Sequence, residues 1–389
     1  MSTPLIATRA AGLQSLAAFV PRAGRAYADG RNVDAGPDQP RAVSGLSPYV
    51  RHRLLTEAEI VDAVLQRHTL SAAEKFVQEV CWRTYWKGWL QQRPQAWRDY
   101  VAARDAHLLR LQQISGLRLG YTQACEGRTG IDCFDAWAQE LVATGTLHNH
   151  TRMWFASIWI FTLRLPWELG ADWFMRHLAD ADAASNTLSW RWVAGLHTVG
   201  KHYVARAENI ERYTRGRFNP VGQLNESAAP LTAPPPYARQ PLATLPSDDP
   251  GTPSALLLTD DDLSAGDLWP AAAPPPRAIA VFRGGIAARS PQPLGAVASA
   301  FANAAIDDAM ARLRQRWPDS VVVEPEALAD TGAQQIRMAE APVGPGADAL
   351  PTLPLPVVAL RRDWDAAFWP HAMRGFFQLR ERIPQILGR

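Results

Sequence analysis

Apolar residues recur at spacings of three and four along most of the first 220 residues, and strand-like alternation is nearly absent there. This period predicts that the first part of the chain is almost entirely helical. The segments that carry it are residues 56–66, 72–91, 133–144, 148–163, 171–178 and 190–193. We therefore expect a mainly α protein whose fold is dominated by this helical part.

The pattern changes after residue 254. Short apolar runs at 255–258, 278–282, 321–323 and 356–360 predict strands, and helical periods at 298–317, 327–341 and 371–383 lie between and after them. Strands alternating with helices favour a small α/β domain with a partly parallel sheet. Residues 219–254 are rich in Pro and show neither period, which predicts an extended linker. The expected organisation is a helical domain over 1–218, a linker over 219–254 and an α/β domain over 255–389.

Tryptophan is concentrated in the helical part, where eleven of the 15 Trp lie between Trp82 and Trp192. Such a local excess argues against a generic core and suits stacking, electron transfer or aromatic recognition. The same part is basic, with 26 Lys and Arg against 20 Asp and Glu over residues 1–220, whereas the remainder holds 14 against 18. This asymmetry is compatible with a polyanionic partner such as nucleic acid.

Other classes of protein are disfavoured by the composition. Three cysteines do not make a disulfide framework or a four-cysteine cluster within this chain. The most apolar run, residues 153–163, is 11 residues long, whereas a membrane span needs about 20. The chain has no glycine-rich phosphate loop. We expect a cytoplasmic protein without a membrane span.

The run FVQEVCWRTYW places Glu79, Trp82, Arg83 and Trp86 on one face if it is helical. A carboxylate, a guanidinium and two indoles make a poor core seam, and therefore indicate a candidate site. The alternative is an ordinary amphipathic helix with an internal ion pair between Glu79 and Arg83.

The run HNHTRMW opens a very apolar helix and places Asn149, Arg152 and Met153 on one face. His148 and His150 are two residues apart, so in a helix their side chains point in different directions, which disfavours a metal site. The polar residues are interpreted as lining a buried ligand or as capping the helix.

Two further clusters each have a competing interpretation. Asp180, Asp182 and Asn186 can pair with arginines or with the polar edge of a heterocycle, whereas a Ca²⁺ loop lacks its usual glycine and terminal Glu. Ser44 and Ser47 can hold a phosphate at the start of a predicted helix, or form an ordinary Ser–Pro cap.

In this order, the segments resemble the helical FAD-binding domain of the DNA photolyase/cryptochrome family. The resemblance covers roughly residues 20–220, on the runs GLSPYVRHRLLT, EVCWRTYW, TGIDCFDAWAQELVATGTLHNHTRMW and WFMRHLADADAASNTLSWRWVAG. It implies FAD as cofactor and a short form that lacks the family's N-terminal antenna domain. The C-terminal α/β domain is then a candidate for a relocated, antenna-like domain, although no motif identifies a second chromophore.

The resemblance implies a role for each matching residue. The cofactor-binding set is Tyr27, Ser44, Leu46, Ser47, Arg83, Asn149, Arg152, Asp180, Asp182 and Asn186. Within that set, Arg152 and Asp180 form the ion pair beside the isoalloxazine, and Asn186 faces flavin N5. No metal ligands are implied.

The resemblance also implies a pocket for a flipped pyrimidine dimer. Glu79 would bind the dimer, Trp82 and Trp192 would wedge it, and Asn149 and Met153 would complete the pocket. Trp190 and Trp167 match the inner and middle members of the family's electron relay. Its outer member has no clear counterpart: residues 111–124 offer only Tyr121, and Trp137, Trp154 and Trp173 are the alternatives. Arg31, Lys201 and Arg206 are the predicted DNA contacts.

Three hypotheses about function follow. The first is light-dependent repair of cyclobutane pyrimidine dimers in UV-damaged DNA by electron transfer from excited reduced FAD. The second is a cryptochrome-like blue-light photoreceptor without repair activity. The third is a flavin-binding or structural protein that has lost photochemistry.

Overall fold

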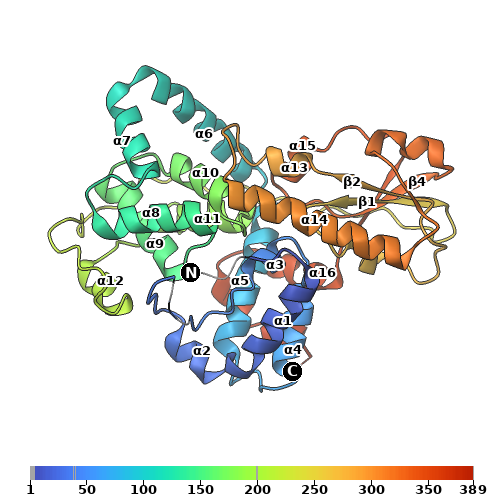
Figure 1. Cartoon of the computed structure of the whole chain (residues 1–389), viewed down its shortest axis with the longest axis horizontal. Helices are drawn as coiled ribbons and strands as arrows, with labels where there is room; N and C mark the ends of the chain where they lie inside the picture. The colour runs from blue at the N-terminus through green and yellow to red at the C-terminus, as the bar shows by residue number, and fades with distance from the viewer. Residues whose placement is uncertain (1–4, 38, 40, 199, 389) are drawn as a thin grey trace.

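The computed structural model describes residues 5–37, 39, 41–198 and 200–388, and consists of a helical part followed by an α/β part (Figure 1). Among the described residues, no helix is long and apolar enough to cross a membrane. The helical part contains α1 (Arg9–Phe19), α2 (Arg25–Gly30), α3 (Ser47–Arg51), α4 (Glu57–Leu65), α5 (Glu74–Gln91), α6 (Gln95–Gln113), α7 (Ser115–Cys125), α8 (Asp132–Thr144), α9 (Asn149–Ser157), a π-helix (Ile158–Thr162), α10 (Trp167–His177), α11 (Ala183–Val193) and α12 (Ala207–Tyr213).

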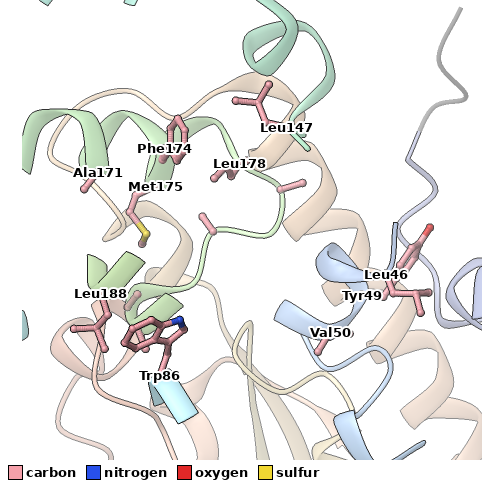
Figure 2. Packing of buried hydrophobic residues seen from close by; sticks show 14 of the residues in the cluster. Leu46, Tyr49, Val50, Trp86, Leu147, Ala171, Phe174, Met175, Leu178 and Leu188 are labelled. Atoms are coloured by element: carbon pink, nitrogen blue, oxygen red, sulfur yellow. The ribbon is translucent and has the colours of Figure 1, made fainter. Parts of the chain in front are cut away.

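Tight packing between α10 and α11 forms the centre of the helical part. Gly170 makes this packing possible, because a Cβ atom there would lie 2.3 Å from the ring of Trp190. Leu188 of α11 lies beside Trp86 of α5, and Met175 and Phe174 of α10 lie nearby (Figure 2). The long helix α6 had no predicted counterpart, because only five of its 19 residues are buried and its apolar period is weak.

The α/β part is built on five parallel strands in the order β3-β2-β1-β4-β5. Their bounds are β1 (Ser254–Thr259), β2 (Ala278–Phe282), β3 (Val321–Val322), β4 (Gln335–Ala339) and β5 (Val357–Leu360). The helices are α13 (Gly284–Ala287), α14 (Ala296–Arg316), α15 (Pro345–Ala349), α16 (Asp363–Phe368), α17 (Phe376–Arg380) and α18 (Ile383–Ile386), with 3₁₀ turns at Ala265–Leu268, Pro325–Thr331 and Trp369–His371. Residues 219–253 contain no helix or strand.

Every residue of β1 is buried, because both faces of the sheet are covered. Leu256 and Leu258 belong to the large core that also contains Phe301 of α14. Leu257 faces a second, smaller core with Leu328. A continuous apolar run is therefore what a central parallel strand requires.

The prediction of a helix over residues 327–341 is wrong. This stretch forms a 3₁₀ turn and then β4, which pairs with β1 on one side and β5 on the other. Its apolar residues fit a helical period, but insertion between two strands overrides local preference. The sheet is also wholly parallel rather than partly parallel, and the predicted helix at 371–383 is divided into short helices.

A buried set of charges joins the two parts of the chain, and we call it the interface network: Arg51, Arg53, Asp260, Asp262 and Asp365. Arg51 donates to a carboxylate oxygen of Asp260 at 3.3 Å, and Arg53 donates to Asp365 at 2.6 Å. Arg53 also contacts Asp262 at 3.3 Å. All five side chains are almost completely inaccessible to solvent.

Asp260 also pairs with an arginine of the α/β part. Its carboxylate also accepts a hydrogen bond from Arg289 at 3.0 Å. Burial alone would raise the pKa of Asp260, but the charges of Arg51 and Arg289 outweigh that effect and lower the pKa to about 2. Asp260 is therefore ionised at neutral pH, and it balances two buried guanidinium groups.

The network lies where an open α/β sheet usually binds ligands. In a sheet of this order, the crevice forms outside the carboxyl ends of the central strands, where the strand order reverses. Here Arg51, Lys87 and Ala183 of the helical part meet Asp261 and the loop after β4 at that place, and the remaining cavity is only about 10 Å³. Such a space holds about one water molecule.

Replacing Asp260 with Asn should destabilise the protein strongly. The shape is kept, but Arg51 and Arg289 lose their counter-charge, and breaking a buried ion pair in this way typically costs about 3–5 kcal/mol. Urea denaturation measures the loss. As a control, Asp307→Asn removes a solvent-exposed pair with Arg283 and should cost less than about 1 kcal/mol. Equal effects of the two substitutions would contradict the importance of the network.

The difference in unfolding free energy between the wild type and Asp260→Asn should shrink in acid. The folded pKa of Asp260 is about 2, below its ordinary value of 3.8, so its stabilisation is complete above the ordinary value and is lost as the pH falls through 2. We expect the difference to fall by about 1 kcal/mol between pH 5 and pH 3. A pH-independent difference in urea melts would show that the ionised carboxylate is not responsible.

Candidate functional site

A cavity of about 940 Å³ lies between the helical part and α14. Its walls come from α3, α5, the start of α9 and α14, and Leu46, Val50 and Leu147 mark two of its sides (Figure 2). This volume is near the upper end of the range for small-molecule sites, as a large two-part cofactor requires. Eight of the ten predicted cofactor-binding residues line it: Tyr27, Ser44, Leu46, Ser47, Arg83, Asn149, Arg152 and Asp180.

An ion pair between Arg152 and Asp180 forms the charged end of the cavity. Arg152 donates to both carboxylate oxygens of Asp180, at 3.0 and 2.9 Å, and its Nε donates to the carbonyl of Leu147 at 3.0 Å. Burial alone would raise the pKa of Asp180, but the charge of Arg152 lowers it. The pair is therefore ionised, and it presents a fixed guanidinium to the cavity.

The two remaining predicted cofactor residues, Asp182 and Asn186, do not line the cavity. Asp182 accepts a hydrogen bond from the backbone of Ser185 at 2.7 Å, so it caps α11, and it pairs with Arg83 at 3.2 Å. The amide of Asn186 donates to the carbonyl of Ala171 at 2.8 Å. In this structure, Asp182 therefore orients Arg83, and Asn186 joins α11 to α10.

The loop before α3 supplies the hydroxyl groups of the cavity. Gly45 has a φ of +68°, a left-handed conformation that favours glycine, and the hydroxyl of Ser44 accepts from the backbone of Leu46 at 3.3 Å. Ser44, Ser47 and the nearby Arg41 all line the cavity. Hydroxyl groups and a guanidinium are the chemistry that binds a phosphate.

Only part of the predicted dimer pocket is brought together. Glu79 and Asn149 line the cavity, whereas Met153, Trp82 and Trp192 do not. Glu79 pairs with Arg31 at 2.7 Å. Burial raises the pKa of Glu79 in spite of that arginine. A raised pKa favours a carboxyl group that can donate a hydrogen bond to a ligand carbonyl.

Both indoles predicted to wedge a dimer already pack against other rings. Trp82 stacks on Phe376 of α17, with ring centroids 3.7 Å apart and planes 13° from parallel. Trp192 stacks on Tyr203 at 5.9 Å. The contact with Phe376 could not be predicted from the sequence, because nearly three hundred residues separate it from Trp82.

The two predicted relay indoles have different ring neighbours. Trp190 lies 6.1 Å from Trp159, and Trp159 lies 6.0 Å from the half-buried Tyr121. Trp167 instead lies 5.7 Å from Tyr100. Trp159, which had no predicted role, lies between Trp190 and Tyr121 in this structure, and its place in an apolar helical run gave no signal for that position.

The remaining predictions concern surface residues and histidines. Lys201 and Arg206 are exposed, as a contact with a phosphate backbone requires. His148 accepts a hydrogen bond from the backbone of His150 at 3.2 Å, so it caps α9. Within the described residues, no cluster of His, Cys, Asp or Glu has the geometry to hold a metal ion.

One wall of the cavity had no sequence prediction at all. Val297, Ala300, Phe301 and Ala304, on one stripe of α14, complete it from the α/β part. The small alanine side chains of α14 let this helix lie close to the helical part. Their spacing in the sequence does not indicate which segment they face. The α/β part therefore helps to build the site.

Comparisons with known proteins agree with the position of this cavity. Residues 76–227 match the family model described as the FAD binding domain of DNA photolyase. A deoxyribodipyrimidine photo-lyase of Streptomyces griseus is 31% identical over 215 residues, which cover 52% of this chain and 44% of that protein. A cryptochrome DASH of Gloeobacter violaceus is 32% identical over 163 residues, covering 39% and 32%. The matches span less than half the length of these relatives.

A solved bacterial class III photolyase from Agrobacterium tumefaciens superposes with a TM-score of 0.42 and 28% identity, covering 53% of this chain and 42% of that one. The region matched by the family model includes most of α5 and the start of α9, which line the cavity, whereas α3 and α14 lie outside it. The helical part of this chain is therefore similar to the FAD-binding domain of DNA photolyases.

Proposed function

We propose that the cavity binds FAD and that the chain is a light-dependent flavoprotein that repairs cyclobutane pyrimidine dimers in UV-damaged DNA. The observation that carries this proposal is the single cavity shared by the Arg152–Asp180 pair and the carboxyl group of Glu79. Bound, reduced FAD would supply light absorption and an electron that returns after the ring bonds of the dimer break. Every other contribution comes from residues of the chain.

The residues around the cavity have separate tasks in this proposal. Ser44, Ser47 and Arg41 would hold the pyrophosphate, and Arg152, fixed by Asp180, would hold the polar edge of the flavin. Glu79 would donate a hydrogen bond to a carbonyl of the flipped dimer, where negative charge develops. Burial raises the pKa of Glu79, which supports that role, whereas the contact with Arg31 orients the carboxyl group and acts in the opposite direction on its pKa.

A cryptochrome-like photoreceptor without repair activity is the second candidate. The stacking of Phe376 on Trp82 favours it, because one face of a predicted dimer clamp is already covered. The two functions differ in DNA binding. Selective retardation of dimer-containing oligonucleotides in a gel-shift assay supports repair, and equal binding of damaged and undamaged DNA supports the photoreceptor.

We propose that the α/β part closes the cofactor cavity through α14. The filled crevice at the interface network supports this role, since the place where such a sheet usually binds ligands is taken by the helical part. An antenna-like role and a second chromophore remain predictions from the strand–helix order.

Asp180→Asn should weaken FAD binding by about tenfold or more, because Arg152 loses the charge that fixes it and a charge-assisted bond contributes about 1.5–3 kcal/mol. Titration of the apoprotein with FAD, followed by flavin fluorescence, measures the affinity. Asp307→Asn is the matched control and should bind FAD as the wild type does. An unchanged affinity of Asp180→Asn for FAD would show that the ion pair does not contribute to FAD binding.

Glu79→Gln should lower the rate of dimer repair under blue light by about tenfold to a hundredfold, because preorganised hydrogen bonds to developing charge have effects of this size. The bound FAD should remain at the wild-type level. Glu74→Gln, an exposed change on the same helix, should repair normally. If the wild-type protein repairs dimers and Glu79→Gln repairs them equally fast, Glu79 has no role in the reaction.

A further inference from the structure

The C-terminal segment of the chain lies along α5, the helix that carries both Glu79 and Trp82. The side chain of Gln92 donates to the carbonyl of Trp369 at 2.9 Å, and the hydroxyl of Tyr85 donates to the carbonyl of Arg374 at 2.6 Å. Gly88 makes room for Trp369, since a Cβ atom at this glycine would lie 2.8 Å from the indole. These contacts fix the segment in place on the helix that carries Glu79.

Two consecutive phenylalanines in this segment have opposite surroundings. Phe376 is 3% exposed and stacks on Trp82. Phe377 is 66% exposed, the highest value among the large aromatic side chains that the structure describes. Phe376 therefore anchors the segment on Trp82, three residues along α5 from Glu79, and Phe377 is exposed to solvent next to that anchor.

Residues 373–382, which we call the C-terminal strip, combine apolar and cationic groups. Met373 is 44% exposed, and the guanidinium of Arg380 lies 5.1 Å from the ring centre of Phe377. Arg374 and Arg382 are also exposed, and Glu381 is the only acidic residue of the strip. A single exposed apolar residue needs no explanation, but an aromatic ring among arginines at the edge of a nucleotide site does.

We propose that the C-terminal strip is a DNA-contacting surface and that Phe377 is a wedge that enters the duplex beside the flipped dimer. This inference rests on the proposed repair function. Flipping a nucleotide leaves a gap in the base stack, and proteins commonly insert an apolar side chain at such a step. The arginines of the strip would neutralise the flanking phosphates.

If Phe377 is a wedge, its contribution to binding should differ between duplex and single-stranded DNA. In a duplex, Phe377 replaces stacking that the flipped dimer has lost, whereas a single strand has no opposite strand to hold apart. Phe377→Ala should therefore weaken binding of a dimer-containing duplex by about tenfold, since stacking on an aromatic ring is worth about 1–3 kcal/mol per base. Binding of the same dimer in single-stranded DNA should change less than about twofold.

The experiment is a fluorescence-anisotropy titration of the FAD-loaded full chain with both forms of DNA. Leu119→Ala is the control, because Leu119 is 60% exposed on α7, far from the C-terminus of the chain in Figure 1. Phe377→Trp keeps a large ring and should keep the wild-type affinity. Photoreduction of the flavin should be the same in all variants.

Three outcomes overturn the wedge. Wild-type affinity of Phe377→Ala for the duplex does so directly, and so does an equal loss on both DNA forms, since Phe377 would then contact the lesion strand alone. A change in the oligomeric state of Phe377→Ala in light scattering would identify the strip as a protein contact instead. If the wild type binds neither damaged DNA form selectively, the proposed repair function itself fails.

Discussion

The buried pairing of two arginines with carboxylates at the end of β1 is the constraint on which the rest of the structure depends. Arg51 ends α3 and Arg53 follows it, whereas Asp260, Asp262 and Asp365 come from the α/β part. An unpaired charge at such depth costs several kcal/mol, so the two parts are stable only when these groups meet. Because α14 belongs to the same rigid α/β layer, the pairing also places the last wall of the cofactor cavity.

This arrangement separates two places that could each bind a ligand. The crevice at the carboxyl ends of the sheet is filled and retains about 10 Å³, whereas the cavity beside α14 has about 940 Å³. The α/β part therefore contributes to the proposed cofactor site through α14, which lines the cavity, and not through the crevice at the ends of its strands. His52 connects the network to the cavity wall, because its Nδ1 lies 2.7 Å from the backbone carbonyl oxygen of Asp260 and its ring centre lies 5.8 Å from that of Phe301.

The sequence predicted the features that depend on neighbouring residues and on the order of motifs. The period of α5, α8 and α9 is local, and eight of the ten cofactor residues implied by the resemblance line one cavity. The sequence did not predict the features that depend on contacts between segments far apart in the chain. Residues 335–339 become β4 only because β1 and β5 pair with them, and the stacking of Phe376 on Trp82 depends on how the two ends of the chain meet. Asp182 and Asn186 match the family's motif, but their side chains bond to the helices instead of facing the cavity.

The central claim is that the cavity between α3, α5, α9 and α14 holds a photoactive flavin. An absorption spectrum of the purified protein, recorded before and after blue light in the presence of a reductant, tests it most directly. The account predicts bands of oxidised flavin that bleach on illumination and return in air, with about one FAD per chain. A colourless protein that does not take up added FAD, or a bound flavin whose spectrum light leaves unchanged, would contradict it.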